Sequence, residues 1–265
     1  MSENNQELHH PSQNKQGAEK IMPYNAGQAK GEQVETMFDS IAPAYDLMNS
    51  LMSLGMHTRW RNKALKMALE RLSRPAKDVL DVATGTGDLI FALADRLPAS
   101  ELTGIDLSEG MLEKARQKMQ ALPAMDRRRI RFMQADCLAL PFPDDAFDLI
   151  TVAYGVRNFE DTLQGYREML RVLRPGGVIC VVELACPDSA LPFAGYKLYT
   201  RGLIPVAGKL ISGDSRAYSY LHESIEAAPQ RERMAAIMKE AGFSRPKWKA
   251  LFPGVVCIYL AEKKK

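Results

Sequence analysis

A short stretch between an apolar run and a helical pattern carries groups that could bind a small ligand. It contains Asp81, Thr84, Gly85, Thr86 and Gly87, and it follows the apolar residues 79 and 80. Such an apolar run is typical of a buried parallel strand, and glycines directly after it let the backbone turn sharply and approach a ligand. Leucines at positions 89, 93 and 97 then begin a helix. The order strand, loop, helix predicts a ligand-binding strand end.

The loop does not fit two common phosphate-binding patterns. A dinucleotide-binding loop has a third glycine three residues after Gly87, where this chain has Ile90. A phosphate loop continues with Gly-Lys-Ser/Thr, where this chain has Asp88 and Leu89 after the glycine. The carboxylate of Asp88 would also repel a pyrophosphate. The loop therefore favours a ligand that is neutral or cationic where it meets the backbone.

Polar residues follow three further predicted strands, and the carboxyl ends of parallel strands meet at one edge of a sheet. Asp106 comes about 20 residues after the glycines, the distance at which a carboxylate accepts hydrogen bonds from both ribose hydroxyls. Singly, these residues could be a helix cap, a turn former or a surface ion pair. Together, at successive strand ends, they favour an adenosine-type ligand. The later ends carry Asp136 and Cys137, then Ala153, Arg157 and Asn158.

The elements that must position these residues alternate between strand and helix. This alternation predicts an α/β fold with a doubly wound, mostly parallel sheet. A late helix is followed by two strands that are close enough for an antiparallel hairpin. The expected strands cover 78–83, 101–106, 130–134, 147–153, 177–184, 246–251 and 255–261.

Residues 31–265 are predicted to form one domain, with N-terminal helices over 31–75. Residues 1–30 are rich in Asn, Gln, Lys, Glu and Ser, so we predict a disordered tail. The segment 189–222 interrupts the alternation with aromatic residues between glycines and prolines. It could be a helix that packs on the core or a lid over a large apolar substrate. Its place near the strand ends favours the lid.

Composition excludes several classes of protein. The net charge is +3 and the basic residues are scattered, so nucleic-acid binding is not indicated. The four cysteines show no Cys-x-x-Cys pair and no zinc spacing with histidine, which predicts no metal site. No apolar run approaches the about 20 residues that span a bilayer, and no signal peptide is recognisable. A cytoplasmic protein is expected.

Several longer motifs accompany the glycine loop. They are Asp81-x-Ala83-x-Gly85-x-Gly87, Phe38 to Asn49, Leu140-Pro141-Phe142-Pro143-Asp144, Gly155-Val156-Arg157-Asn158, residues 172–177 and 219–225. In the glycine motif the chain resembles the class I S-adenosylmethionine (SAM) methyltransferases, and in the others it resembles more narrowly the C-methyltransferases of quinone biosynthesis. That family comprises the demethylmenaquinone and 2-polyprenyl-methoxybenzoquinol methyltransferases. The resemblance runs from about residue 34 to 261.

The resemblance implies a Rossmann-like sheet of seven strands with an antiparallel C-terminal strand, and SAM as the cofactor. The family's cofactor positions fall on Thr86, Asp106 and Asp136-Cys137. Many relatives have Asn-Ala at the last pair, but Asp136 can still accept from the adenine amino group. Some relatives place a cofactor-contacting serine where this chain has Ala153.

The resemblance also implies methyl transfer from SAM to a ring carbon of a polyprenyl quinol. Demethylmenaquinol is favoured over 2-polyprenyl-6-methoxy-1,4-benzoquinol by the Ala-Thr-Gly-Thr-Gly-Asp loop and the Asn/Gln-rich leader. Arg157 is the expected cation that stabilises the phenolate, and Asn158 is expected to orient the quinol oxygen. The side chains expected to line the site are Tyr45, Asp46, Tyr196 and Tyr220.

The isoprenoid tail of such a substrate implies transient contact with a membrane surface, at the inner face. We expect residues 189–211, with Lys197, Arg201 and Lys209, to lie nearest the lipid. A homodimer is left open. The alternative function is a SAM-dependent methyltransferase for another phenolic or lipid-like small molecule, and a non-catalytic protein of the same fold ranks lower.

Overall fold

The structure is a computed structural model, and it describes residues 17–25, 27–187 and 215–265. Seven strands form one sheet in the order β3-β2-β1-β4-β5-β7-β6. Strands β1 to β5 pair in parallel, whereas β7 runs antiparallel to both β5 and β6. The predicted α/β class, with an antiparallel strand at the C-terminus, is therefore confirmed. The strands are β1 (Asp78–Val82), β2 (Glu101–Asp106), β3 (Ile130–Gln134), β4 (Phe147–Ala153), β5 (Leu173–Leu184), β6 (Ser244–Leu251) and β7 (Val256–Glu262).

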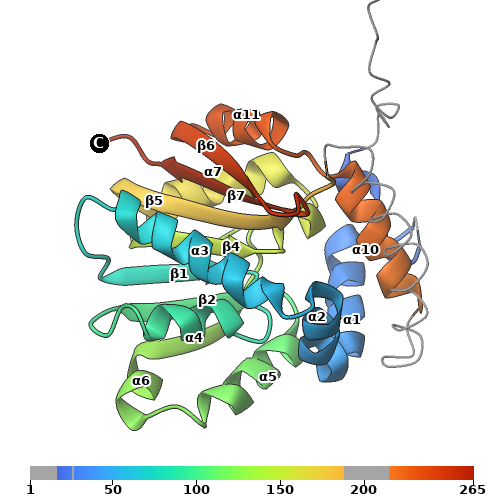
Figure 1. The fold of residues 1–265 in the computed structure, drawn as a ribbon, viewed down its shortest axis with the longest axis horizontal. Coiled ribbons are helices and arrows are strands. Elements are labelled where there is room, and N and C mark those ends of the chain that lie inside the picture. Colours follow the sequence, from blue (N-terminus) through green and yellow to red (C-terminus); the bar gives the residue numbers. More distant parts are fainter. Residues whose placement is uncertain (1–16, 26, 188–214) are drawn as a thin grey trace, which may run out of the picture.

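Helices cover both faces of the sheet (Figure 1). Helices α3 (Met56–Arg71) and α4 (Asp88–Ala94) pack on one face, and α7 (Thr162–Val172) and α11 (Glu232–Glu240) pack on the other. Successive strand residues point to opposite faces of the sheet. Val79 therefore packs in the apolar cluster with α3 and α4, and Leu80 packs in the cluster with α7 and α11. This burial on both faces explains the nearly continuous apolar runs of the sequence.

Three helices stand together beyond one end of the sheet in Figure 1. They are α1 (Lys30–Ile41), α2 (Tyr45–Ser53) and α10 (Ser215–Ala227), and the short helix η2 (Ala42–Ala44) joins the first two. Their apolar cluster includes Met37, Met48 and Tyr220, together with Met111 of α5 (Glu109–Met119). Ser108 caps α5 by accepting from the N–H of Met111. The short helix α6 (Ala124–Arg129) directly precedes β3, at the other end of the sheet (Figure 1).

The N-terminal segment differs from the predicted disorder over residues 17–25 and 27–30. Its short helix η1 (Ala18–Lys20) is held by Lys30, whose side chain is fully buried. The Lys30 ammonium donates to the carbonyl of Ala18 at 2.6 Å and to those of Arg157 and Phe159 at 3.3 Å. These long-range polar contacts order a segment whose composition contains too few apolar residues to predict it. Residues 1–16 and most of the predicted lid, 189–214, lie outside the described residues, and 215–222 belong to α10.

Candidate active site

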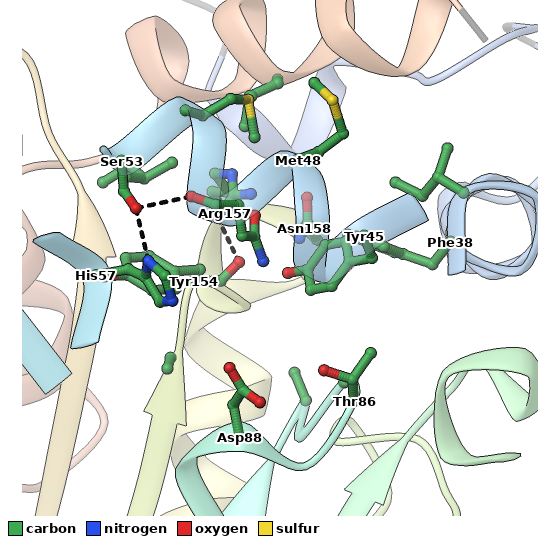
Figure 2. Close-up of a pocket in the computed structure, with 18 of the residues that line it drawn as sticks. Phe38, Tyr45, Met48, Ser53, His57, Thr86, Asp88, Tyr154, Arg157 and Asn158 are labelled. Carbon is green, nitrogen blue, oxygen red and sulfur yellow. Dashed lines mark hydrogen bonds between the residues drawn. The ribbon is translucent and has the colours of Figure 1, made fainter. Parts of the chain in front are cut away.

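Two adjoining cavities lie where β1 and β4 end, beneath α1 and α2. We call the first the acidic cavity, because Asp106 and Asp136 line it. We call the second the aromatic cavity, because Tyr45, Trp60 and Tyr154 line it. Figure 2 shows the second, with side chains from the glycine loop below and those from α2 and α3 above and to the side. Both cavities share seven lining residues, which are Phe38, Tyr45, Ala83, Gly85, Ala153, Tyr154 and Asn158.

The acidic cavity brings together the predicted residues of the second and third strand ends. Asp106 accepts from the N–H of Gly85 at 2.8 Å and from that of Ser108 at 3.0 Å. Burial raises the pKa of Asp106 to about 6. Asp136 accepts from the N–H of Leu138 at 2.8 Å, and burial raises the pKa of the neighbouring Cys137 thiol, which therefore stays protonated. An anionic pair of oxygens beside a small neutral side chain suits a ribose diol and a neutral base.

The two glycines of the loop, Gly85 and Gly87, are needed for different reasons. Gly85 has φ +56°, and a Cβ there would meet only the ring of Tyr45, at 4.0 Å. The backbone at Gly85 is therefore open to a ligand. Gly87 has φ +81° and lines neither cavity. A Cβ at Gly87 would lie 2.9 Å from the ring of Phe91 and 3.1 Å from that of Phe132, so helix packing requires this glycine rather than close approach to a ligand.

Asp81 lies at the base of the aromatic cavity, below Thr84 of the loop. Its carboxylate accepts from the hydroxyls of Thr84 and Thr151, both at 2.6 Å. Burial raises the pKa of Asp81 to about 7, and the two hydroxyl donors oppose that shift. The residue thus holds the start of the loop and presents a carboxyl group to one end of the cavity.

A polar network fixes the outer side of the loop. The Thr86 hydroxyl donates to Asp46 at 2.6 Å, and Lys118 donates to both residues. Asp88 pairs with Lys118 and with Arg61. Burial alone would raise the pKa of Asp88, but its two cationic partners outweigh burial and lower it. The charge of Asp88 is therefore neutralised within the chain, which weakens the argument that it would repel a pyrophosphate.

Asp46 differs from its predicted place in the catalytic site. It lines neither cavity, and its carboxylate accepts from Thr86 and Lys118. Its neighbour Tyr45 does line both cavities. The helical turn at the start of α2 points the two side chains in different directions, so only Tyr45 reaches the ligand space. We therefore assign Asp46 to holding the loop.

Arg157 and Asn158 lie side by side on η3 (Val156–Asn158) and line the aromatic cavity. The Arg157 guanidinium pairs with Glu183 of β5 at 2.8 Å, and these side chains are 7% and 1% exposed. It also donates to the carbonyl of Tyr154 (Figure 2). Asn158 accepts from the hydroxyl of Tyr220, a residue that the sequence also placed here, at 3.2 Å. Tyr196 lies outside the described residues.

The sequence did not point to Glu183 or to a Ser53–His57 pair in the aromatic cavity. Glu183 is a carboxylate within the apolar strand β5. A buried acid in an apolar run indicates a charged or hydrogen-bonding partner, so this position could have been singled out from the sequence. Ser53 and His57 lie at the end of α2 and the start of α3, with 2.6 Å between Oγ and Nδ1. Ser53 and His57 are four residues apart across the break between two helices, and this spacing alone does not predict that their side chains meet.

The parallel sheet, the loop after β1 and the acid after β2 define the class I SAM-dependent methyltransferase fold. A methyltransferase of known structure from Thermotoga maritima, described as a possible histamine N-methyltransferase, has the same fold. It superposes with a TM-score of 0.59 at 17% identity, over 87% of this chain and 99% of that one.

The chain belongs to the ubiE/COQ5 methyltransferase family, whose model matches residues 26–263. A demethylmenaquinone methyltransferase from Bacteroides fragilis is 43% identical over 92% of this chain and 98% of its own length. A ubiquinone/menaquinone biosynthesis C-methyltransferase from Geobacter sulfurreducens is 42% identical over 88% of this chain and 90% of its own length. The chain is a SAM-dependent methyltransferase.

The residues present fit SAM. The acidic cavity would take the adenosine, with Asp106 at the ribose and Asp136 and Cys137 at the base. Gly85 leaves its backbone open where the two cavities meet. In the aromatic cavity, the buried Nε of Arg61 has no hydrogen-bond partner among the described residues, so it can receive the methionine carboxylate.

Proposed function

We propose that this enzyme transfers the methyl group of SAM to a ring carbon of demethylmenaquinol. The observation that carries the proposal is the aromatic cavity, which places Arg157 and Asn158 beside apolar side chains such as Met37 and Met48. A planar aromatic ring with two hydroxyls fits this cavity, because the apolar side chains can contact the ring and Arg157 and Asn158 can donate hydrogen bonds to its oxygens. The relatives' names supply the particular quinol.

Methyl transfer to carbon requires an electron-rich ring. A phenolic hydroxyl with a pKa of about 10 is about three units above neutral pH, so its ionisation costs roughly 4 kcal/mol. Hydrogen bonds and positive charge at the oxygen reduce that cost. When SAM is bound, its sulfonium supplies the electrophilic methyl group.

Arg157 would act here as a hydrogen-bond donor more than as a free cation. Burial alone would lower its pKa, but Glu183 outweighs burial and raises it, so the guanidinium stays charged. Glu183 also neutralises much of its field. The Nε of Arg157 is buried and has no hydrogen-bond partner among the described residues, so it can donate to the quinol oxygen. Asn158 would orient the same ring.

An assay with reduced demethylmenaquinone and radiolabelled SAM tests the function. We expect label in menaquinol with the wild-type protein, and a turnover number reduced for Arg157→Ala while SAM affinity is kept. Wild-type turnover and normal quinol affinity in that variant would remove Arg157 from the mechanism. Label transferred to other phenols but not to the quinol would favour the alternative function. The quinones that accumulate in a deletion strain would separate the menaquinone and ubiquinone pathways.

Contact with a membrane surface is the second part of the proposal, because the substrate's isoprenoid tail resides in lipid. None of the helices in the described residues is long and apolar enough to cross a membrane. The segment first expected to meet lipid, 189–211, lies largely outside those residues. On the described surface, α2 exposes Leu47 and Leu51, and Leu54 directly after the helix is exposed too, with exposed fractions of 55%, 48% and 80%. This spacing forms one apolar stripe beside the aromatic cavity.

Basic side chains also recur on α3, the next helix of the chain. Arg59, Lys63 and Lys66 are exposed and recur at i, i+4 and i+7. An apolar stripe beside basic side chains fits the interface of an anionic bilayer, at the cytoplasmic face. Flotation with vesicles that contain phosphatidylglycerol should recover the wild-type protein and lose the Leu54→Glu variant. Met125→Glu is the matched control, since Met125 is 72% exposed on α6. Equal flotation of all three proteins would contradict this surface.

A further inference from the structure

The methyl transfer described above leaves one proton without an acceptor, and this inference rests on that proposed function. The ring carbon forms a bond to the methyl carbon while the methyl–sulfur bond breaks, and its electron pair stays on sulfur. The quinol hydroxyl loses its proton as the ring carbon attacks. The ring carbon then loses its hydrogen as a proton and the oxygen regains one, so one proton leaves the site in each turnover. Arg157 cannot take it, because a guanidinium stays protonated.

A hydrogen-bond chain fixes the tautomer of His57. The Ser53 hydroxyl donates to the carbonyl of Asn49 at 2.7 Å, and its oxygen lies 2.6 Å from Nδ1 of His57. The hydroxyl has a single proton, which is already donated to Asn49. Nδ1 must therefore carry a proton and donate it to Ser53. The other ring nitrogen, Nε2, is left with a free electron pair, as a general base requires.

His57 belongs to the same cavity as the proposed reacting ring. Ser53, His57, Arg157 and Asn158 all line the aromatic cavity. In the view of Figure 2, His57 and Tyr45 stand on opposite sides of this space, with Arg157 and Asn158 between them. A quinol ring bound by Arg157 and Asn158 would therefore have the imidazole of His57 on one side.

Charged groups around the imidazole oppose its protonation in the resting enzyme. Burial lowers the pKa of His57, and the positive charge of Arg61 lowers it further, while Asp88 and Asp46 act in the opposite direction. His57 is accordingly neutral at neutral pH and able to accept a proton.

The other titratable side chains of the cavity are less suited. Asp81 is held by two threonine hydroxyls at the end that faces the loop. Burial raises the pKa values of Tyr45, Tyr154 and Tyr220, so they stay protonated. Asp88 is held by its ion pairs with Arg61 and Lys118. His222 of α10 also lines the cavity, and its Nε2 lies 3.4 Å from Glu226.

We propose that His57, held by Ser53, is the general base that accepts the quinol proton through Nε2. The structure assigns this role to a residue in the first turn of α3 rather than on the sheet. Ser53 acts as a positioning residue, because it fixes the tautomer and touches no reacting atom.

Single-turnover kinetics with SAM prebound test the proposal once the wild-type protein has been shown to methylate the quinol. His57→Gln should slow the chemical step by about 10²- to 10⁴-fold, remove the acid limb of the rate–pH profile and leave SAM affinity unchanged. Ser53→Ala should cause a smaller loss with the acid limb kept. Thr58→Gln, at an exposed neighbour on α3 that lines neither cavity, is the matched control and should stay close to wild type. Added imidazole should partly restore the rate of His57→Gly.

A second measurement tests the tautomer of His57 independently of enzyme activity. Nitrogen NMR of the free protein at neutral pH should report His57 as the Nδ1-protonated tautomer, and Ser53→Ala should mix the two tautomers. A His57→Gln rate and pH profile equal to wild type would overturn the proposal, as would an Nε2-protonated tautomer. Wild-type protein that methylates no quinol would instead overturn the proposed function.

Discussion

Replacing Glu183 by Gln should destabilise the fold far more than replacing Arg157 by Met, although both changes break the same ion pair. The two side chains are 1% and 7% exposed, and 2.8 Å separates their nearest atoms. Removing one partner of a buried pair costs about 3–5 kcal/mol when the other charge is left uncompensated. Arg157 meets that condition in Glu183→Gln, because it cannot release its proton.

Glu183 keeps two backbone hydrogen bonds when the Arg157 side chain is absent. Its carboxylate still accepts from the backbone N–H of residue 157 at 3.2 Å and from that of Leu184 at 2.8 Å. We therefore expect Arg157→Met to cost only about 1–3 kcal/mol, the cost of an acceptor that has lost one partner. The double variant should be more stable than Glu183→Gln alone.

Urea unfolding followed by circular dichroism measures these differences, with free energies extrapolated to water. The control is Glu226→Gln on α10, a surface carboxylate whose side chain is 33% exposed, which should change stability by less than about 0.5 kcal/mol. The reasoning fails if Arg157→Met costs as much as Glu183→Gln, or if Glu183→Gln costs less than about 1 kcal/mol.

Three further predictions concern the cofactor side of the molecule. The Kd for SAM should rise as pH falls below about 6, because Asp106 is then protonated, and calorimetry of Asp106→Asn should give weaker binding without this rise. Gly155→Ala should lower the free energy of unfolding by about 1–3 kcal/mol, since its Cβ would lie 2.5 Å from that of Ala83; unchanged denaturant midpoints would contradict the close contact. Lys30→Met should expose the segment around Ala18 to limited proteolysis and weaken SAM binding, and a digestion rate equal to wild type would show that the ammonium does not anchor it.

The sequence predicted the strands and their polar ends well, because both follow from local patterns. Asp106, Asp136 and Asn158 were placed from their position after apolar runs, and the structure gathers them around two adjoining cavities. Strand-end position suffices in a parallel sheet, because all such ends meet at one edge. The direction of a side chain at a helix start is not fixed in this way. Asp46 therefore turned away from the site that its neighbour Tyr45 lines.

Contacts between distant parts of the chain explain what the sequence did not reveal. Lys30 lies in a stretch whose composition resembles a solvated tail, and two of its three partners lie more than a hundred residues away, at η3 and directly after it. Glu183 looks like one polar position in an apolar strand until Arg157 is placed against it. A pairing of this kind depends on the register of the whole sheet, which local periodicity does not supply.

The place of β7 imposes an order on the biosynthesis of this enzyme. β7 follows both β5 and β6 in the sequence but lies between them in the sheet. Until it emerges, β5 presents an open edge and β6 has no neighbour, and such edges pair readily with other chains. The sheet that supports the cofactor can close only after β7 has been synthesised, so the nascent chain should depend on protection by chaperones until then.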